Sequence, residues 1–403
     1  MDNITHSLAG LVAGETVIRF QERRGTLLSA SARRWVWGVS LLANNFPDFD
    51  ILYARITSGN LGYLLHHRGH THTIVGAIPQ AGILLALVWI FSRWRKTEWT
   101  SPVWKTFAVV ALLGPLLHLA MDATNSYGVH PFWPLMNGWF YGDSIFIIEP
   151  WFSVLATPGL FRLSSSSLLR ALLIIVFAAG ISLGTAFGMV PTSIATVLAC
   201  AGLATSLAIR LVPVERALPV TVSLVLIAFS VFAVCGRSVR AQLKGRLAVS
   251  DLILTPLPAN PLCWSIIAVE MDSRSDSYRL SRGVVATLPQ WMPVDLCPEL
   301  FASSLKAKPR RLAQLVNDST IRWNDRFEMT LSHLEELKER CDVMGFLRFA
   351  RAPFYEEREG QIVLGDLRFE RGASSFSRMI LNERVEKCPQ RVPAWTPPIE
   401  RNY

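Results

Sequence analysis

Residues 66–91 read HHRGHTHTIVGAIPQAGILLALVWIF, so a histidine-rich stretch leads directly into a long apolar run. Four of the chain's eight histidines lie within His66–His72. The run from Thr73 to Phe91 is long enough to cross a bilayer, which takes about 20 residues. Imidazole is the commonest metal ligand in proteins and the usual general base at neutral pH. We therefore expect a membrane protein with a functional site at one end of a span.

The composition is that of an integral membrane protein. Of the 403 residues, 51% are apolar or aromatic and only 18% are charged, against about 25% in soluble domains. Further apolar segments occur at 4–19, 35–46, 106–121, 151–161, 171–189, 192–209 and 217–234. We therefore expect a mainly α membrane protein in which residues 1–240 form a polytopic helical bundle. The first two segments are short for a full span, so both a re-entrant position and packing inside the bundle stay open.

The composition changes near Arg237, where charge rises and prolines appear. We expect residues 245–403 to form a small extramembrane α+β domain. The segments predicted as strands are 265–270, 283–287 and 361–369, and those predicted as short helices are 312–316 and 330–341.

The net charge of +9 indicates asymmetry between loops. No basic stretch is interleaved with stacking aromatics, so we expect no nucleic-acid partner. If the eight apolar segments alternate, the basic loops 19–34, 93–105, 162–170 and 210–216 share one face, which the positive-inside rule makes cytoplasmic. The histidine stretch and the C-terminal domain are then expected on the non-cytoplasmic side. The basic residues of 237–246 would also lie there, against the rule.

Four cysteines are spread through the C-terminal part, at positions 263, 297, 341 and 388. Their wide spacing without a CxxC pair fits disulfides better than zinc. Four free thiols remain the alternative, and a disulfide would agree with a non-cytoplasmic domain.

Two groupings of acidic residues and histidine offer metal ligands. His118 and Asp122 are four residues apart, so on a helix they share one face and can clamp an ion. Asp48 and Asp50 follow Pro47 in a turn. Taken alone, the first grouping also fits a hydrogen bond inside the bundle, and the second also fits a solvated turn.

The histidine stretch is harder to explain without a site, because imidazoles and a guanidinium at a membrane boundary need partners. Arg68 can hold a phosphate group through two parallel hydrogen bonds. The candidate metal ligands that fall near one face are His6, Asp48, Asp50, His67, His72, His118, Asp122 and Asp143. Nitrogen and oxygen ligands without cysteine favour a catalytic zinc or manganese over a structural metal. More than four candidates indicate two or more divalent ions.

Four ordered motifs closely resemble the membrane-bound, predicted metal-dependent hydrolases of the YbcI/YdjM type. They are MDNITH (1–6), NFPDFD (45–50), HRGHTH (67–72) and HLAMD (118–122). Two further elements also resemble this family: YGD (141–143) with EPW (149–151), where the family more usually has Asp in place of Glu149, and DLRF (366–369), a signature of the longer members' C-terminal domain. The ligand order is also distantly similar to that of zinc-dependent phospholipase C. The resemblance implies hydrolase chemistry and a bacterial inner-membrane location, but it supplies no substrate.

We expect a metal-activated water to attack a phosphodiester or similar ester of a lipid, since a site at the membrane boundary suits a substrate with an apolar tail and a polar head. Arg68 would steady the anionic group, Asp48 or Asp50 would act as general base, and Asp122 would bridge two ions. A metal-ion or proton-coupled transporter that uses the same His/Asp cluster is the alternative function. A haem-binding protein is disfavoured because the histidines cluster at one boundary near carboxylates, and a scaffold without chemistry stays open.

Overall fold

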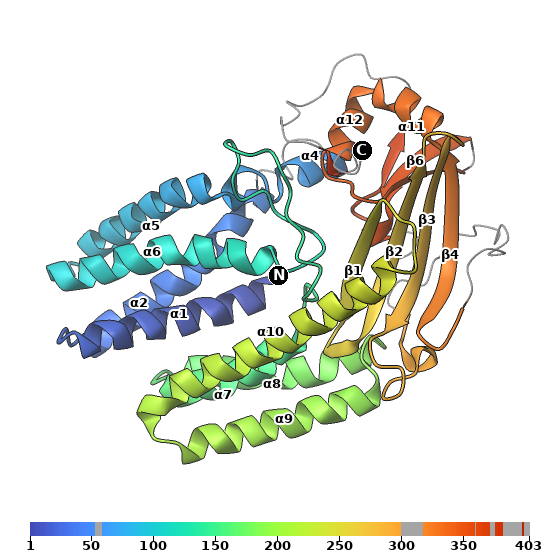
Figure 1. Cartoon of the computed structure of the whole chain (residues 1–403). Helices are drawn as coiled ribbons and strands as arrows, with labels where there is room; N and C mark the ends of the chain where they lie inside the picture. The colour runs from blue at the N-terminus through green and yellow to red at the C-terminus, as the bar shows by residue number, and fades with distance from the viewer. Residues whose placement is uncertain (53–58, 300–316, 359, 371–374, 382–396, 399–403) are drawn as a thin grey trace.

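The structure is a computed structural model, and it describes residues 1–52, 59–299, 317–358, 360–370, 375–381 and 397–398. A helical domain and a C-terminal domain built on β-sheets lie side by side (Figure 1). The helices of the first domain are α1 (Asn3–Arg23), α2 (Ala30–Asn45), η1 (Phe46–Phe49), α4 (Gly59–His66), η2 (His70–His72), α5 (Ile74–Trp94), α6 (Ser101–Asp122), α7 (Pro150–Leu163), α8 (Ser167–Ala186), α9 (Thr192–Leu211) and α10 (Val214–Lys244).

Each apolar segment of the sequence forms a helix, which confirms the mainly α membrane bundle. Among the described helices, α5, α6, α8, α9 and α10 are long and apolar enough to cross a membrane. α1 and α2 are less apolar than these five helices, and both pack against α6. A side chain at Gly10 of α1 would place its Cβ 2.7 Å from the Ser40 carbonyl oxygen of α2, so only glycine allows this approach.

The four basic loops meet at one end of the helical domain. The contacts that join them are Arg19 Nη1 to the Glu215 carbonyl oxygen at 3.2 Å, Arg162 Nη1 to the Val212 carbonyl oxygen at 2.7 Å, and the Trp35 ring to the Trp99 ring at 5.5 Å between centroids. This is the shared end that the alternation of segments predicts. α6 runs away from it for 22 residues, which is about 33 Å of helix and matches the thickness of a bilayer's hydrocarbon core.

Two antiparallel sheets form the C-terminal domain, together with α11 (Leu331–Lys338) and α12 (Cys341–Leu347). The larger sheet has the order β1 (Asp251–Leu257), β2 (Asn260–Asp272), β3 (Ser277–Ala286), β4 (Ile321–Thr330), and the smaller has β5 (Pro353–Arg358), β6 (Gln361–Asp366), β7 (Met379–Leu381). The expected α+β character is therefore confirmed. Predicted strand 361–369 ends early, at Asp366, because Leu367–Phe369 turns into a short 3-10 helix. The predicted helix 312–316 lies outside the described residues.

Both faces of the larger sheet are buried, since successive side chains of a strand point to opposite faces. Leu252 and Leu254 pack on the last turns of α10, whereas Ile253 packs on the opposite side. α10 comes close because Gly236 faces the Trp264 ring, where a Cβ would lie 2.8 Å from the nearest ring carbon. α10 therefore joins the helical domain to the sheet as one continuous 31-residue helix.

The opposite face of the sheet shares its core with α4, the helix that leads into the histidine stretch. Leu61, Leu64 and Leu65 of α4 belong to the same buried cluster as Ile253 and Phe346 of the C-terminal domain. The position of the histidine stretch thus depends on the C-terminal domain as well as on the helical bundle.

Cys263 and Cys297 form a disulfide, and Cys341 is also disulfide-bonded, whereas Cys200 and Cys235 are free. The structure thus favours the disulfide interpretation of the C-terminal cysteines over four free thiols. Disulfides persist in oxidising compartments, in agreement with a domain outside the cytoplasm.

Replacing both Cys263 and Cys297 with Ser should lower the free energy of unfolding of the C-terminal domain by about 2–5 kcal/mol, because the unfolded chain regains the freedom that the bridge removes. Pulse proteolysis in urea measures this on the detergent-purified full chain. The matched control is the double replacement Cys200→Ser/Cys235→Ser, which should leave the urea midpoint unchanged. Equal midpoints for the two double variants would contradict a stabilising bridge.

Candidate metal centre

Four buried side chains converge where α6 ends: Asp48, His72, His118 and Asp122. Each offers one ligand atom, and all four atoms lie within 4.8 Å of one another. Three separate parts of the chain meet here, since η1 supplies the first residue, η2 the second and α6 the last two. The grouping of His118 with Asp122 follows from their spacing of one helical turn, as the sequence predicts.

The distances between the imidazole nitrogens and the carboxylate oxygens match the geometry of a four-coordinate ion. His72 Nε2 and His118 Nε2 are 3.0 Å apart, and each lies 3.4–3.5 Å from Asp48 Oδ1 and from Asp122 Oδ2. In a tetrahedral site with metal–ligand bonds of about 2.0–2.2 Å, the ligand atoms stand about 3.3–3.6 Å from one another. The side chains are therefore already arranged around the volume that one ion would fill.

The outer nitrogens of the two imidazoles fix which atom faces the centre. His118 Nδ1 is 2.7 Å from the Asn44 carbonyl oxygen, which can only accept, so Nδ1 carries the proton. His72 Nδ1 is 3.0 Å from the Thr71 hydroxyl oxygen, whose own proton goes to Asp50 at 2.7 Å, so this Nδ1 also donates. Both Nε2 atoms consequently present lone pairs to each other, an arrangement that a cation between them stabilises.

Asp50 lies behind His72 and stands outside the group of four. Its carboxylate accepts from His67 Nδ1 at 2.9 Å, from the Arg68 backbone N–H at 3.0 Å and from Thr71. Burial alone would raise the pKa of Asp50, but the hydrogen bonds with His67 and His72 hold that pKa below its usual range. The ionised carboxylate fixes the orientation of the histidine stretch, which is the usual role of a carboxylate behind a metal-binding imidazole.

Asp122 uses its two carboxylate oxygens differently. Oδ1 accepts from Arg68 Nη2 at 2.9 Å and from the Met1 amino group. Oδ2 faces the two imidazoles and has no hydrogen-bond partner among the described residues. A fully buried carboxylate oxygen without a partner is costly, and an ion in the centre would remove that cost.

His6 stands next to the group. Its ring stacks on the His118 ring at 3.7 Å, and its Nε2 lies 3.4 Å from Asp122 Oδ1. Neither ring nitrogen of His6 has a hydrogen-bond partner within the described ranges. The guanidinium of Arg68 already contacts the same carboxylate oxygen, and its positive charge opposes a second cation there. The expectation that two or more ions bind here is not tested by the structure and remains a prediction from the sequence.

Arg68 is held in place by the wall of the site. It has a positive φ of 60°, its Nη1 donates to the Asn125 side chain and the Gly128 carbonyl oxygen at 3.2 Å each, and its guanidinium stacks 4.3 Å above the Tyr127 ring. The same guanidinium lines a cavity beside the metal centre. Arg68 thus joins the ligand Asp122 to the segment 125–128.

That cavity has a volume of about 380 Å³ and lies between the two domains. Of the four ligand residues, Asp48 lines it. Its other lining residues from the helical domain include Ile51, Tyr63, His67, Arg68, Tyr127 and Phe146, and those from the C-terminal domain include Thr255, Arg368, Phe369 and Phe376. The cavity wall is thus mostly apolar and aromatic, with two guanidinium groups.

The motif DLRF attaches the C-terminal domain to this wall. Arg368 donates to both carboxylate oxygens of Asp366, and it also donates to the Ser126 carbonyl oxygen at 2.8 Å and the Phe349 carbonyl oxygen at 2.9 Å. Ser126 lies inside the segment that Arg68 contacts from the other side. One arginine from each domain therefore holds the loop that follows Asp122.

Asp143 lies outside the group of four, although the sequence suggested it as a ligand. It accepts from Arg351 Nη1 at 2.9 Å and from Arg240 Nη2 at 2.7 Å. Arg351 in turn binds Asp251 of β1. The YGD element thus serves the contact between domains in this structure, as does Glu149, which accepts from the Ala259 backbone N–H at 3.4 Å. Burial raises the pKa of Glu149 to about 8.

The sequence did not reveal several residues that support the ligands. Asn44 orients His118 through a backbone oxygen, so the side chain carries no signal. In the sequence, Thr71 is marked only by its position between two histidines, and its role in orienting His72 could not be predicted. Asn125 acts through contacts made by the fold alone, because it lies 57 residues from Arg68 in sequence.

Comparison with known families agrees with this geometry. A family model matches residues 1–195, which contain all four ligand residues, and its description is YdjM inner membrane protein. Residues 1–195 are thus similar to the YdjM inner membrane protein family. The resemblance seen in the motifs is thereby confirmed. The YdjM match ends within α9, so α10 and the sheets lie beyond it. No curated protein and no solved structure matches the chain.

The group of four predicts that His72→Ala and His118→Ala each abolish retention of a divalent metal, because each removes one lone pair from a site of four ligands. Elemental analysis of detergent-purified protein measures the metal content. The matched control is His70→Ala, since His70 is exposed and belongs to the same stretch but not to the group. Metal content that falls equally in all three variants, or that is negligible in the unaltered protein, would contradict this centre.

Proposed function

We propose that this protein is a membrane-bound, metal-dependent hydrolase that cleaves a phosphodiester or similar ester of a lipid. The observation that carries the proposal is the convergence of two imidazole lone pairs with two carboxylate oxygens beside a cavity of mixed polarity. A divalent ion bound by such a site lowers the pKa of its water toward about 7 and stabilises negative charge on the attacked centre. Nitrogen and oxygen ligands suit zinc best, and manganese is the alternative.

His67 is the candidate general base and acid. Its Nδ1 is bound to the buried carboxylate of Asp50 at 2.9 Å, which leaves Nε2 as the atom that can take up or release a proton. The ring lines the cavity, and burial lowers the pKa of His67, so the neutral, basic form prevails at neutral pH. A carboxylate behind an imidazole is the arrangement that orients a catalytic histidine. Asp50 then positions His67 and is not itself the base.

The shape and lining of the cavity support a lipid as substrate. Aromatic and apolar side chains such as Tyr63, Phe146 and Phe376 can contact an apolar tail, and Arg68 and Arg368 add positive charge next to Asp48. The cavity lies where α6 ends, at the membrane boundary that the length of this helix implies. A molecule with an acyl chain and an anionic head group meets both requirements.

We further propose that the centre and the C-terminal domain face away from the cytoplasm. The four basic loops share the opposite end of the helical domain, and positively charged loops favour the cytoplasmic side. The disulfide between Cys263 and Cys297 fits an oxidising compartment. We propose the inner membrane of a bacterium as the location of the protein.

Asp122→Asn should abolish hydrolysis while the protein still inserts and folds, because the amide keeps the size of the side chain and removes the charge that attracts the ion. Arg68→Lys should reduce turnover by a smaller factor, since lysine keeps the charge but cannot contact Asp122, Asn125 and Gly128 at once. Turnover of a panel of phospholipids and lipid-linked phosphates in detergent micelles is the measurement.

The control for this assay is His70→Ala, which should match the unaltered protein. Size-exclusion profiles and thermal unfolding of all variants separate loss of chemistry from loss of fold. If Asp122→Asn turned over the same substrate as fast as the unaltered protein, the hydrolase proposal would fail. Metal-dependent ion uptake into proteoliposomes without turnover of any ester would favour the transporter instead.

A further inference from the structure

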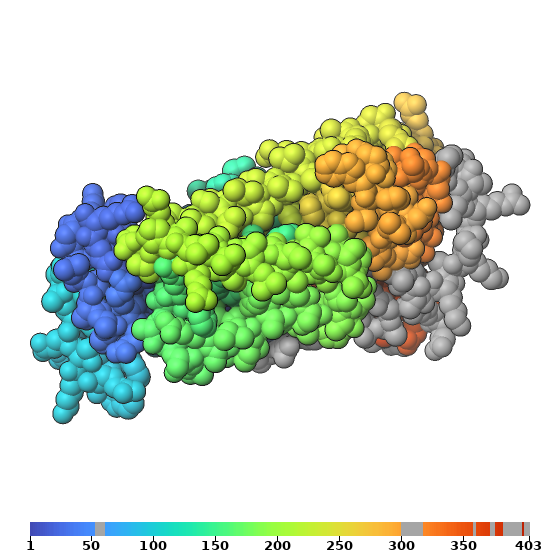
Figure 2. Space-filling view, turned by 90° about the horizontal axis from the view of Figure 1, so that it is seen from below, coloured from blue at the N-terminus to red at the C-terminus, as the bar shows by residue number. Residues whose placement is uncertain are grey.

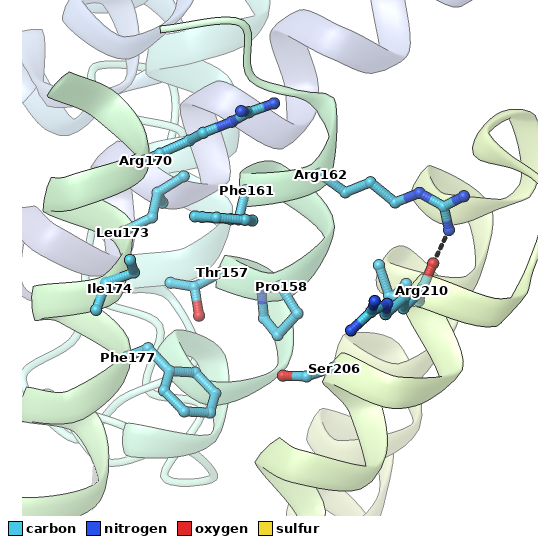
Figure 3. A pocket seen from close by; sticks show the side chains of 11 residues that line it. Thr157, Pro158, Phe161, Arg162, Arg170, Leu173, Ile174, Phe177, Ser206 and Arg210 are labelled. Atoms are coloured by element: carbon cyan, nitrogen blue, oxygen red, sulfur yellow. Dashed lines mark hydrogen bonds between the residues drawn. The ribbon is translucent and has the colours of Figure 1, made fainter. Parts of the chain in front are cut away.

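A second cavity, distant in sequence from the metal ligands, lies among α7, α8 and α9. Its volume is about 620 Å³. Figure 3 shows the side chains that surround it, with α8 on one side and α9 on the other. The apolar part of the lining consists of Pro158, Phe161, Leu173, Ile174, Phe177 and Ile209. No aspartate or glutamate of the described residues lines it.

The rest of the lining consists of Thr157, Ser206 and three arginines, at positions 162, 170 and 210 (Figure 3). Arg162 is fixed, because its Nη1 donates to the carbonyl oxygens of Ile209 and Val212 where α9 ends. Arg170 and Arg210 are exposed, and among the described residues no carboxylate lines the cavity beside them. Two guanidinium groups thus stand beside an apolar cavity.

The surroundings of this cavity are those of a membrane boundary. It lies at the end where the basic loops meet, next to the start of α8 and the last turns of α9. The outer faces of α8 and α9 are apolar and exposed, as at Leu172, Ile175 and Leu207. Figure 2 shows this face of the molecule, with the helices between the N-terminal helices and the C-terminal domain. Arginines at such a boundary stand at the level of lipid head groups, and the apolar lining stands at the level of acyl chains.

The depth of the lining fits part of an acyl chain. Phe177 follows Arg170 by seven residues along α8, which is about 10 Å of helix rise. The cavity is thus charged at its outer end and apolar towards the middle of the membrane. Arg170 also stacks 5.4 Å from the Phe161 ring centroid, so its guanidinium stays beside the cavity.

We propose that this cavity binds one anionic phospholipid of the bilayer, separate from any substrate of the metal centre. Its phosphate would contact Arg170 and Arg210, and one acyl chain would lie against Leu173, Ile174 and Phe177. Basic pockets between membrane helices on the cytoplasmic side are suited to anionic head groups. The lipid is a bound component of the helical domain, and this proposal does not depend on hydrolysis.

The test is native mass spectrometry of the full chain in detergent, titrated with phosphatidylglycerol, with phosphatidylcholine and with inorganic phosphate. Phosphatidylglycerol should bind with a stoichiometry of one and more tightly than the other two. Arg170→Gln/Arg210→Gln should weaken this binding by about 25-fold, because each basic side chain at an anionic lipid surface contributes about five-fold. The matched control is Arg93→Gln/Arg95→Gln, which removes two exposed arginines from another basic loop.

A second variant, Ser206→Trp, fills the cavity and keeps every charge, and it should also remove the bound lipid. Equal weakening by the control pair would mean general charge attraction and would overturn the proposal. Retention of phosphatidylglycerol by Ser206→Trp would overturn the role of the cavity. Binding of inorganic phosphate as tight as that of the lipid would also overturn it, because the acyl chain would then contribute nothing.

Discussion

The buried carboxylate of Asp122 is the constraint on which the rest of this structure depends. A carboxylate without solvent must be compensated by positive charge and hydrogen bonds. Arg68 and the Met1 amino group compensate Oδ1, and the two imidazoles face Oδ2. These partners come from three parts of the chain, so the surroundings of one side chain bring together the residue before α1, the histidine stretch and the end of α6.

The same requirement extends to the C-terminal domain. Arg68 holds Asp122 and also the loop of residues 125–128, and Arg368 holds this loop from the other side. The YdjM family match ends at residue 195, yet residues of the C-terminal domain complete the cavity beside the candidate metal centre. The longer chain thus adds a wall beside a group of four residues that all lie in the matched region, and the shape of the cavity depends on both parts.

Much of the fold could be predicted from the sequence, because an apolar run about 20 residues long has few alternatives to a membrane helix. His118 and Asp122 could be grouped because a helix fixes their relative position. The sequence could not distinguish the roles of Asp48 and Asp50, since both follow Pro47 in the same turn. In the structure Asp48 faces the centre, whereas Asp50 lies behind His72. Asp143 could not be assigned either, because its partners Arg240 and Arg351 are brought to it by the packing of the domains.

The central claim is that Asp48, His72, His118 and Asp122 hold one divalent ion. A crystal structure of the protein with anomalous scattering data at the zinc absorption edge tests it most directly. If these four residues bind zinc, an anomalous peak is expected about 2.0–2.2 Å from both Nε2 atoms and from one oxygen of each carboxylate. A peak located elsewhere, for example between His67 and Asp50, or a centre without a peak in protein that contains zinc, would contradict it.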